Sequence, residues 1–464
     1  GWKLPIVGHP QNHSVVLNDE QMESVRSDLE IPVGQEWSGF PTDSLEGELC
    51  AEVSRRLYPP RPVPIASPPS PIPNELPTAY QGTRSTQQTF GAVLSSLSRQ
   101  CPQLTERIVT VSPDVASSTN LGGWINKHEV WRLDPPEELP EDQTAGILKW
   151  TESPQGQHIE LGISENNLFL MLGQLGLSQE LFGQTLLPIG TLYDPFIRRG
   201  LDALFYSVYS GARFIVVGTP SGVTLSREGG IHQSLLTASI GAELPELLAY
   251  EPCFAQELEW IMLDSLSRLQ QRSSSSYLRL TTKQVDQESF PDVSDSQRRE
   301  RLRRHVLAGA YRLRDSRELS GYEPNGRIVH LLACGAMVPE ALAAVEPLRR
   351  SGIFVNVFNV TGPGPLFTRF QRAVLKVADT DNLFDELVPP EERGAPVVTV
   401  CDAHPHSLSW IGGALGSRLW PLGVVKFGQS GSLDEVYREC RIDTESIVAA
   451  CRLAAEATSR EKAT

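Results

Sequence analysis

The chain alternates between short apolar runs and longer segments whose apolar residues recur every three or four positions. Runs of about four to eight apolar residues are typical of buried strands, and the longer periodic segments are typical of amphipathic helices. This alternation predicts parallel βαβ units and an α/β fold. The predicted strands are Arg107–Val111, His158–Ile163, Phe214–Gly218, Arg327–Ala333, Phe354–Val360, Ala395–Val400 and Leu422–Phe427. The predicted helices are Phe90–Arg99, Glu165 to about Gly173, Arg199–Tyr209, Pro252–Leu269, Pro339–Ser351, Asp434–Cys440 and Thr444–Ala457.

Two changes in composition divide this pattern. Tyr58–Pro77 is rich in proline, which fixes φ and removes a backbone donor, so we expect an extended connector there. Serines 273–276 and the charged segment Lys283–Arg304 mark a second boundary. We therefore predict two three-layer α/β domains with mainly parallel sheets. The expected parts are an N-terminal segment 1–57, a proline-rich linker 58–82, a first domain 83–284, a polar linker 285–325 and a second domain 326–464.

The N-terminal segment contains one predicted helix, Asn18–Asp28, which Asn18 or Asp19 can cap. The chain as a whole is acidic, with 41 Lys and Arg against 56 Asp and Glu, a net charge of −15. That balance argues against a surface for nucleic acid or anionic membrane. The basic run Arg298–Arg304 is therefore interpreted as the solvated face of a helix.

Other features of the composition bear on location. No apolar run approaches the roughly 18 residues that a membrane span needs, and no basic-then-apolar leader opens the sequence. The seven cysteines are odd in number and include no CxxC pair, which suits reduced thiols better than a disulfide framework. We therefore expect a cytoplasmic protein.

Four short motifs follow one another in the first predicted domain. They are the loop Asp114–Asn120, the segment Gly162–Asn167 (GISENN), Tyr193–Phe196 (YDPF) and Glu228–Gln233 (EGGIHQ). Their order resembles the pyrimidine-binding domain of transketolase-type thiamine diphosphate enzymes, which show a D-L-A-x-S-N-like loop, G-I-x-E-x-x and E-D-G-x-T-H-Q. Asn120 stands one residue later than the family places its Asn.

The two ends of the chain narrow this resemblance. Residues 1–14 are similar to the loop that closes the diphosphate domain in the homodimeric type of pyruvate dehydrogenase decarboxylating component, and residues 426–448 are similar to its third domain. The resemblance implies that residues 1–57 end a diphosphate-binding domain. It also implies that the two predicted α/β domains are a pyrimidine-binding domain and a transketolase C-terminal-like domain.

The resemblance assigns the central catalytic role to Glu165. In these enzymes the Glu of G-I-x-E hydrogen-bonds N1′ of the cofactor's aminopyrimidine, so that the cofactor itself can act as a base while the protein sets its tautomer. A strand-like run precedes Glu165, which is the first residue of a predicted helix. The alternative interpretation is an ordinary acidic residue in the first turn of a helix.

Further positions carry expected roles. Tyr193 and Phe196 match the aromatic pair that holds the pyrimidine ring, although they could also be core aromatics. His232 matches a catalytic donor or acid/base group over the reacting carbon, although it could be a surface histidine. The resemblance adds His13 as a catalytic loop residue, Asp114 as a cofactor contact, and Ser118, Glu228 and His9 as substrate contacts.

The resemblance also implies Mg²⁺ beside the diphosphate, but the family's G-D-G metal motif is missing from this sequence. The candidate zinc pattern Cys401-x-x-His404-x-His406 lacks a fourth ligand, and we do not favour it. We therefore nominate no metal ligand here. We expect the missing half of the site on an N-terminal domain or companion chain, the protein being a piece of a longer enzyme or one subunit of a split one.

Two reactions compete. One is decarboxylation of a pyruvate-like 2-oxo acid with acyl transfer, in a homodimer or heterotetramer that works with a lipoyl-bearing acyltransferase. The other is transketolase-type transfer of two carbons between sugar phosphates, which need cationic partners for their phosphate. Thr282 stands where transketolases carry an Arg, so the sequence favours the 2-oxo acid. A third alternative is a non-catalytic regulatory or structural chain.

Overall fold

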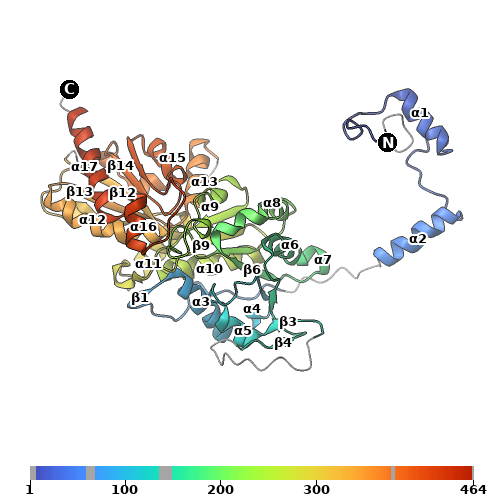
Figure 1. Cartoon of the computed structure of the whole chain (residues 1–464), viewed down its shortest axis with the longest axis horizontal. Helices are drawn as coiled ribbons and strands as arrows, with labels where there is room; N and C mark the ends of the chain where they lie inside the picture. Colours follow the sequence, from blue (N-terminus) through green and yellow to red (C-terminus); the bar gives the residue numbers. More distant parts are fainter. Residues whose placement is uncertain (1–6, 59–67, 135–148, 325, 378–381, 462–464) are drawn as a thin grey trace. The chain divides into compact units, whose positions relative to one another are not determined.

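The computed structural model describes residues 7–58, 68–134, 149–324, 326–377 and 382–461 (Figure 1). The chain forms two compact units, Gly1–Ile65 and Ala66–Thr464. Part of the proline-rich segment and the first six residues lie outside the described residues. Among the described residues, no helix is both long enough and apolar enough to cross a membrane.

The first unit contains two helices, α1 (Asp19–Asp28) and α2 (Leu45–Leu57). Asn18 caps α1, as predicted: its side chain accepts the Gln21 N–H at 2.8 Å, and the Gln21 side chain accepts the Asn18 N–H in return. The sequence analysis did not predict α2. Neither helix has a buried residue, and residues 7–58 of this unit form no buried core.

The second unit contains an eight-stranded parallel sheet with strand order β4-β3-β5-β2-β6-β7-β9-β8. Alternate residues of its central strands enter two different hydrophobic clusters, so both faces of the sheet are covered. The strands are β2 (Ile108–Ser112), β3 (Val130–Trp131), β4 (Glu152–Ser153), β5 (His158–Glu160), β6 (Leu187–Leu192), β7 (Ile215–Gly218), β8 (Leu247–Tyr250) and β9 (Ser275–Arg279).

Helices on opposite faces of this sheet supply the two clusters. The helices α3 (Thr86–Gln100), α5 (Gly122–His128) and α10 (Ala255–Gln270) pack in the first cluster. The helices α6 (Glu165–Gly176) and α8 (Leu201–Tyr209) pack in the second. The strands β1 (Thr83–Arg84) and β10 (Val285–Asp286) form a short antiparallel ribbon, which joins the two ends of this region.

A five-stranded sheet follows, with order β11-β13-β12-β14-β15. Its strands are β11 (Tyr311–Arg314), β12 (Ile328–Cys334), β13 (Phe354–Val360), β14 (Val397–Val400) and β15 (Leu419–Leu422), all parallel except the edge strand β11. The helices α12 (Val338–Arg350) and α17 (Thr444–Glu461) pack together on this sheet, and α13 (Pro363–Val374), α14 (Leu383–Leu387) and α15 (His406–Leu415) also belong to it. The prediction of two α/β regions with mainly parallel sheets is confirmed.

Three local predictions need correction. The last strand is Leu419–Leu422 rather than Leu422–Phe427, because the chain bonds back to the loop after β14 through Val424 N–H to Ala403 O and then leaves the sheet, so that Phe427 is 83% exposed. The serines near 275 belong to β9, not to a boundary. The polar segment 285–325 contains the edge strand β11 and the helix α11 (Ser296–Ala308).

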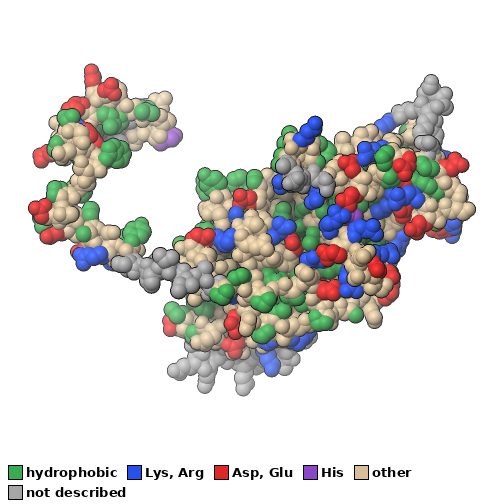
Figure 2. Space-filling model, turned by 180° about the vertical axis from the view of Figure 1, so that it is seen from behind, with side chains coloured by type: hydrophobic (Ala, Val, Ile, Leu, Met, Phe, Trp, Pro, Cys, Tyr) green, Lys and Arg blue, Asp and Glu red, His purple; other side chains and the backbone are tan. Residues whose placement is uncertain are grey.

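The basic run on α11 is helical, as interpreted. Three of its arginines form ion pairs with carboxylates: Arg299 with Glu75, Arg303 with Glu300, and Arg304 with Glu386. Acidic and basic side chains are interspersed over the face of the molecule that Figure 2 shows. This mixing is typical of a solvated surface rather than of a nucleic-acid interface.

Candidate active site

The predicted site residues of the second unit follow four neighbouring strands of the eight-stranded sheet. Glu165 comes after β5, Asp114 after β2, the Tyr193–Phe196 turn after β6, and His232 in the long connection after β7. These strands are adjacent and parallel. Because the carboxyl ends of parallel strands meet at one edge, the chain brings these residues to the same edge of the sheet.

Glu165 is the first residue of α6 and is 7% exposed. Its Oε1 accepts a hydrogen bond from Nη1 of Arg199 at 2.7 Å. A Cβ at Gly200 would lie 2.8 Å from the Glu165 carbonyl oxygen and would overlap Phe169, so glycine at this position lets α6 approach the following turn closely. The carboxylate thus lies where a helix N-terminus and a guanidinium both favour negative charge.

Three aromatic rings lie together next to Arg199, the partner of this carboxylate. The rings of Tyr193 and Phe196 are nearly parallel, with centroids 6.1 Å apart, and His232 meets Phe196 edge-on at 5.4 Å. Arg199 Cζ lies 3.8 Å from the centroid of Phe196. A flat ring inserted between two parallel rings needs a separation of about 7 Å. The sandwich of Tyr193 and Phe196 around a pyrimidine therefore stays a prediction that requires the rings to part slightly.

His232 ends the short 3₁₀ turn Gly230–His232. Its Nε2 lies 3.6 Å from Oε2 of Glu228, and its Nδ1 is buried without a partner in the described part of the chain. Gly229 has φ +80° and packs against Ser430, and a Cβ at Gly230 would lie 2.8 Å from the Gly428 carbonyl oxygen. The two glycines are therefore required by the close approach of residues 428–430, and they aim the histidine ring at the aromatic pair.

The loop after β2 holds the other two candidates of this region. Asp114 is exposed, has φ +67°, and donates its backbone N–H to Oε1 of Glu160 at 2.5 Å. Ser118 is exposed, and its carbonyl oxygen accepts a hydrogen bond from the Gln87 side chain at 3.0 Å. The roles of Asp114, Ser118 and Glu228 stay predictions. His9 and His13 are exposed residues of the first unit, and their roles stay predictions as well.

Comparison with known proteins agrees with this geometry. Residues 78–289 match the family model described as the pyruvate dehydrogenase E1 component middle domain. The pyruvate dehydrogenase E1 component of Cupriavidus necator is 24% identical over 370 residues, which are 77% of this chain and 40% of that protein. That of Mycolicibacterium smegmatis is 26% identical over 393 residues, 80% of this chain and 39% of that protein. The chain is therefore similar to pyruvate dehydrogenase E1 components over most of its length, and its fold is transketolase-like.

Other relatives carry transketolase names. A 6-deoxy-6-sulfo-D-fructose transketolase subunit of a Clostridium species is 28% identical over 219 residues, 47% of this chain and 58% of that protein. Transketolase from Leishmania mexicana has the same fold, with a TM-score of 0.61 and 20% identity over 90% of this chain and 51% of that one. A split-gene transketolase, described as an inactive β4 tetramer, has a TM-score of 0.51 at 16% identity, covering 80% of this chain and 98% of that one.

The E1-like chain spans about 40% of the length of the pyruvate dehydrogenase relatives named above. Enzymes of the superfamily use thiamine diphosphate, usually with a divalent metal ion. The residues present fit the pyrimidine end of this cofactor. A buried carboxylate, an aromatic face and the unpartnered Nδ1 of His232 are what a flat heterocycle with ring nitrogens and an amino group would contact.

The described residues do not supply a site for the metal ion beside the diphosphate. Within the described ranges, no three His, Cys, Asp or Glu side chains gather as a metal site would require. The Cys401 thiol contacts Ser407 and backbone carbonyl oxygens, and burial raises its pKa to about 12. His404 accepts the His406 N–H at 3.2 Å, and both side chains are on the surface.

Two residues beside the site were missed in the sequence. Arg199 contacts both Glu165 and Phe196, yet it was treated only as the start of a helix. Asp194 is fully buried in the YDPF turn and accepts hydrogen bonds from Ser234, from Thr237 at 2.6 Å and from Tyr277. An aspartate between aromatic and proline residues after an apolar strand is the signal that could have identified it, because such a side chain needs internal partners.

Proposed function

We propose that the chain supplies the pyrimidine half of a thiamine diphosphate site in an enzyme that decarboxylates a pyruvate-like 2-oxo acid and transfers the acyl group. The observation that carries the proposal is the carboxylate of Glu165, nearly buried at the start of α6 and bonded to Arg199, whose guanidinium lies over the Phe196 ring. The similarity of residues 78–289 to the E1 middle domain supports it. Bound thiamine diphosphate supplies the carbon nucleophile that adds to the substrate carbonyl.

Each residue of the chain has a defined task in this proposal. Glu165 holds N1′ of the aminopyrimidine and fixes its tautomer. Arg199 orients that carboxylate through Oε1 and leaves Oε2 for the ring. Tyr193 and Phe196 cover the ring and exclude water. His232 holds or moves a proton at Nδ1 near the substrate oxygen, because that atom has no partner within the described chain and an imidazole nitrogen can donate or accept a hydrogen bond.

The proposal includes a partner. The diphosphate and a divalent ion such as Mg²⁺ would be held by an N-terminal diphosphate-binding domain or companion chain, in a homodimer or heterotetramer. The fold neighbour that is a split-gene transketolase supports an arrangement in separate chains. A lipoyl-bearing acyltransferase would take the acyl group. An isolated 51.1 kDa monomer with full activity in size-exclusion chromatography would contradict this assembly.

Transketolase activity is the second candidate, favoured by the 28% identity to a transketolase subunit. It would require a cation for the sugar phosphate. Thr282 carries none, and the adjacent Lys283 is engaged by Glu340 at 3.1 Å, by the Ala336 carbonyl oxygen at 2.9 Å and by the Tyr437 ring. This engagement favours the 2-oxo acid.

The deciding experiment uses the chain together with its diphosphate-binding partner. CO₂ release with an artificial electron acceptor is measured over a panel of 2-oxo acids, with and without thiamine diphosphate. Ketol transfer is measured in parallel with xylulose phosphate and ribose phosphate. Thiamine-dependent CO₂ release supports the proposal, whereas ketol transfer without decarboxylation supports transketolase. A complex that binds thiamine diphosphate but turns over neither class points to a non-catalytic chain.

A further inference from the structure

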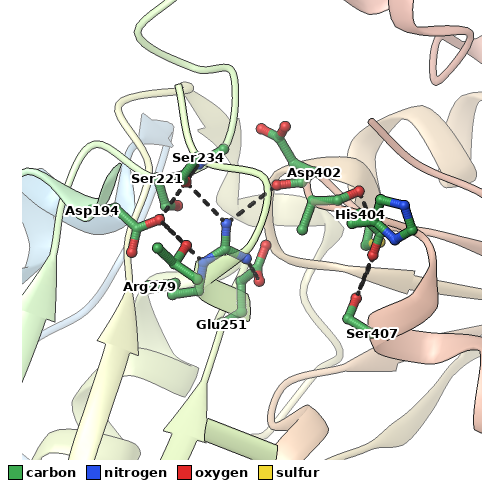
Figure 3. A network of polar contacts seen from close by, with 12 residues as sticks. Asp194, Ser221, Ser234, Glu251, Arg279, Asp402, His404 and Ser407 are labelled. Atoms are coloured by element: carbon green, nitrogen blue, oxygen red, sulfur yellow. Dashed lines mark hydrogen bonds and ion pairs between the residues drawn. The ribbon is translucent and has the colours of Figure 1, made fainter. Parts of the chain in front are cut away.

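A buried network of charged groups joins the two α/β regions (Figure 3). Its centre is Arg279, the last residue of β9, which is 2% exposed. Its Nη1 bonds to the carboxylate of Glu251, its Nε lies 3.4 Å from Oδ2 of Asp194, and its Nη2 donates to the backbone oxygen of Asp402 at 3.2 Å. Asp402 comes from the five-stranded sheet, just after β14. The network thus joins residues of both α/β regions.

The side-chain carboxyl group of Asp402 contacts a different partner from the one that its backbone oxygen contacts. It is 1% exposed, and its Oδ1 accepts the backbone N–H of Val223 at 2.9 Å. Gly222 has φ +62°, and a Cβ there would overlap the Asp402 side chain, so the turn at Gly222–Val223 packs directly on this carboxyl group. The side chain of a residue in the second sheet therefore anchors a loop of the first.

That loop carries His232. Gly222 and Ser234 close its base through two hydrogen bonds, from Gly222 N–H to Ser234 Oγ at 2.8 Å and from Ser234 N–H to Gly222 O at 3.0 Å. The Ser234 hydroxyl then bonds to Asp194, the residue between Tyr193 and Phe196 in the aromatic turn. A continuous set of contacts therefore leads from Asp402 through the base of the loop to both parts of the candidate site.

We propose that Asp402 is a positioning residue, through which the five-stranded sheet fixes the 219–234 loop and thereby His232 and the Tyr193–Phe196 turn. The catalytic consequence rests on the proposed function, whereas the fixation of the loop does not. The carboxyl group is suited to this task because a buried backbone N–H that loses its acceptor is costly, so Val223 holds its place only while Oδ1 is present.

The test compares three variants of the full chain. Asp402→Asn keeps an oxygen for the Val223 N–H, and Asp402→Ala removes it. Thr399→Val is the matched control, because Thr399 is a buried residue of β14, the strand just before Asp402, and its hydroxyl has no hydrogen-bond partner in the described chain. Hydrogen exchange is followed by mass spectrometry in peptides covering residues 219–234 and, for reference, in peptides of β12.

We expect Asp402→Ala to speed exchange in the 219–234 peptides roughly tenfold, while the β12 peptides keep their wild-type rates. Asp402→Asn and Thr399→Val should both behave as the wild type. In the complex with the diphosphate-binding partner, Asp402→Ala should lower kcat roughly tenfold with KM for the substrate nearly unchanged, and Asp402→Asn should restore most of kcat.

Two results would overturn the proposal: unchanged exchange in the 219–234 peptides of Asp402→Ala, or an equal rise in all peptides, which would indicate general support of the fold. If Asp402→Ala does not fold, Asp402→Ser, which is too short to reach Val223, gives the same comparison. If the wild-type complex turns over neither class of substrate, the proposed function fails, and the exchange rates alone decide the role of Asp402.

Discussion

The two sheets of this chain share one architecture but use their carboxyl edges differently. The edge of the eight-stranded sheet presents Glu165, Tyr193, Phe196 and His232, of which the last three are partly exposed. The edge of the five-stranded sheet is buried, with exposures of 0 to 2%, at Cys334, Thr361, Cys401 and Asp402.

The difference follows from what covers each edge. Residues of the first region lie against the second edge: Glu251 donates its backbone N–H to the Thr361 carbonyl oxygen at 2.7 Å, and Arg279 reaches the Asp402 backbone oxygen. The edge of the five-stranded sheet is thus used for contact between the regions, whereas the edge of the eight-stranded sheet keeps the partly exposed side chains of Tyr193, Phe196 and His232. Ligands of open α/β sheets bind at such edges, so chemistry is expected at the first edge alone.

Removal of the Glu165 carboxylate should have the largest effect. We expect Glu165→Gln to lower kcat of the assembled enzyme roughly 10³- to 10⁴-fold, because the amide cannot fix the aminopyrimidine tautomer. The matched control is Asp202→Asn, an exposed acid in the first turn of α8. Steady-state kinetics at saturating thiamine diphosphate check both. Turnover of Glu165→Gln close to that of the wild type would contradict the placement of the cofactor site at the carboxyl edge of the eight-stranded sheet.

The second prediction concerns a substitution that disrupts the buried network between the two α/β regions. Arg279→Met leaves Glu251 and Asp194 buried without their cation, and loss of one partner of a buried ion pair costs about 3 kcal/mol or more. We expect the free energy of unfolding in urea to fall by about that amount. Arg299→Gln is the control, because Arg299 and Glu75 form a surface pair whose side chains are 37% and 49% exposed, and such pairs contribute about 1 kcal/mol at most. Equal losses in the two variants would show that the network does not hold the regions together.

The third prediction concerns the histidine of the open edge. His232→Gln should lower kcat roughly 10²-fold, because general acid/base groups contribute about that much, and should leave the free energy of unfolding nearly unchanged. His406→Gln, at an exposed histidine of the second region, should change neither quantity. Kinetics and urea unfolding of both variants check this. A comparable loss of kcat in both would remove the special role of His232.

The sequence predicted several strands whose residues are nearly all apolar, but it missed β6, β8 and β9. β7, β12 and β13 were predicted, since Val and Ile runs identify a strand covered on both faces. β9 was missed because its serines suggest a boundary. In the structure, the Ser275 hydroxyl accepts the Phe214 N–H at 3.2 Å, which satisfies a polar side chain inside the sheet. Such a partner is distant in sequence and leaves no local pattern.

In the candidate site, too, residues within motifs were predicted, and residues that depend on distant partners were missed. Glu165, Tyr193, Phe196 and His232 were found through their motifs, and the structure brings them to one edge. Arg199 and Asp194 were missed because their roles depend on partners 34 and 40 residues away, Glu165 and Ser234. Residues that act through a distant partner cannot be recognised from periodicity or spacing.

The smallest effect concerns pH and Asp402. Burial raises the pKa of Asp402 to about 7, above its ordinary value of 3.8, so the folded chain keeps this proton where the unfolded chain has lost it. The contribution of Asp402 to stability therefore falls as the pH rises from about 4 to about 7 and is constant above that. The charged and titratable groups that face it are Arg279, Glu251, Lys283, Tyr437, Cys401 and Cys440.

Asp402→Asn does not titrate and keeps an acceptor for Val223. The difference in free energy of unfolding, variant minus wild type, should therefore rise by at least about 1 kcal/mol between pH 4 and pH 7 and then level off. Urea unfolding at pH 4, 5.5, 7 and 8 measures it, with Thr399→Val as a control whose difference stays flat. A difference that falls with rising pH would mean that Arg279 and Lys283 hold the carboxylate ionised. The buried edge would then be an ion-pair interface rather than one that carries a proton.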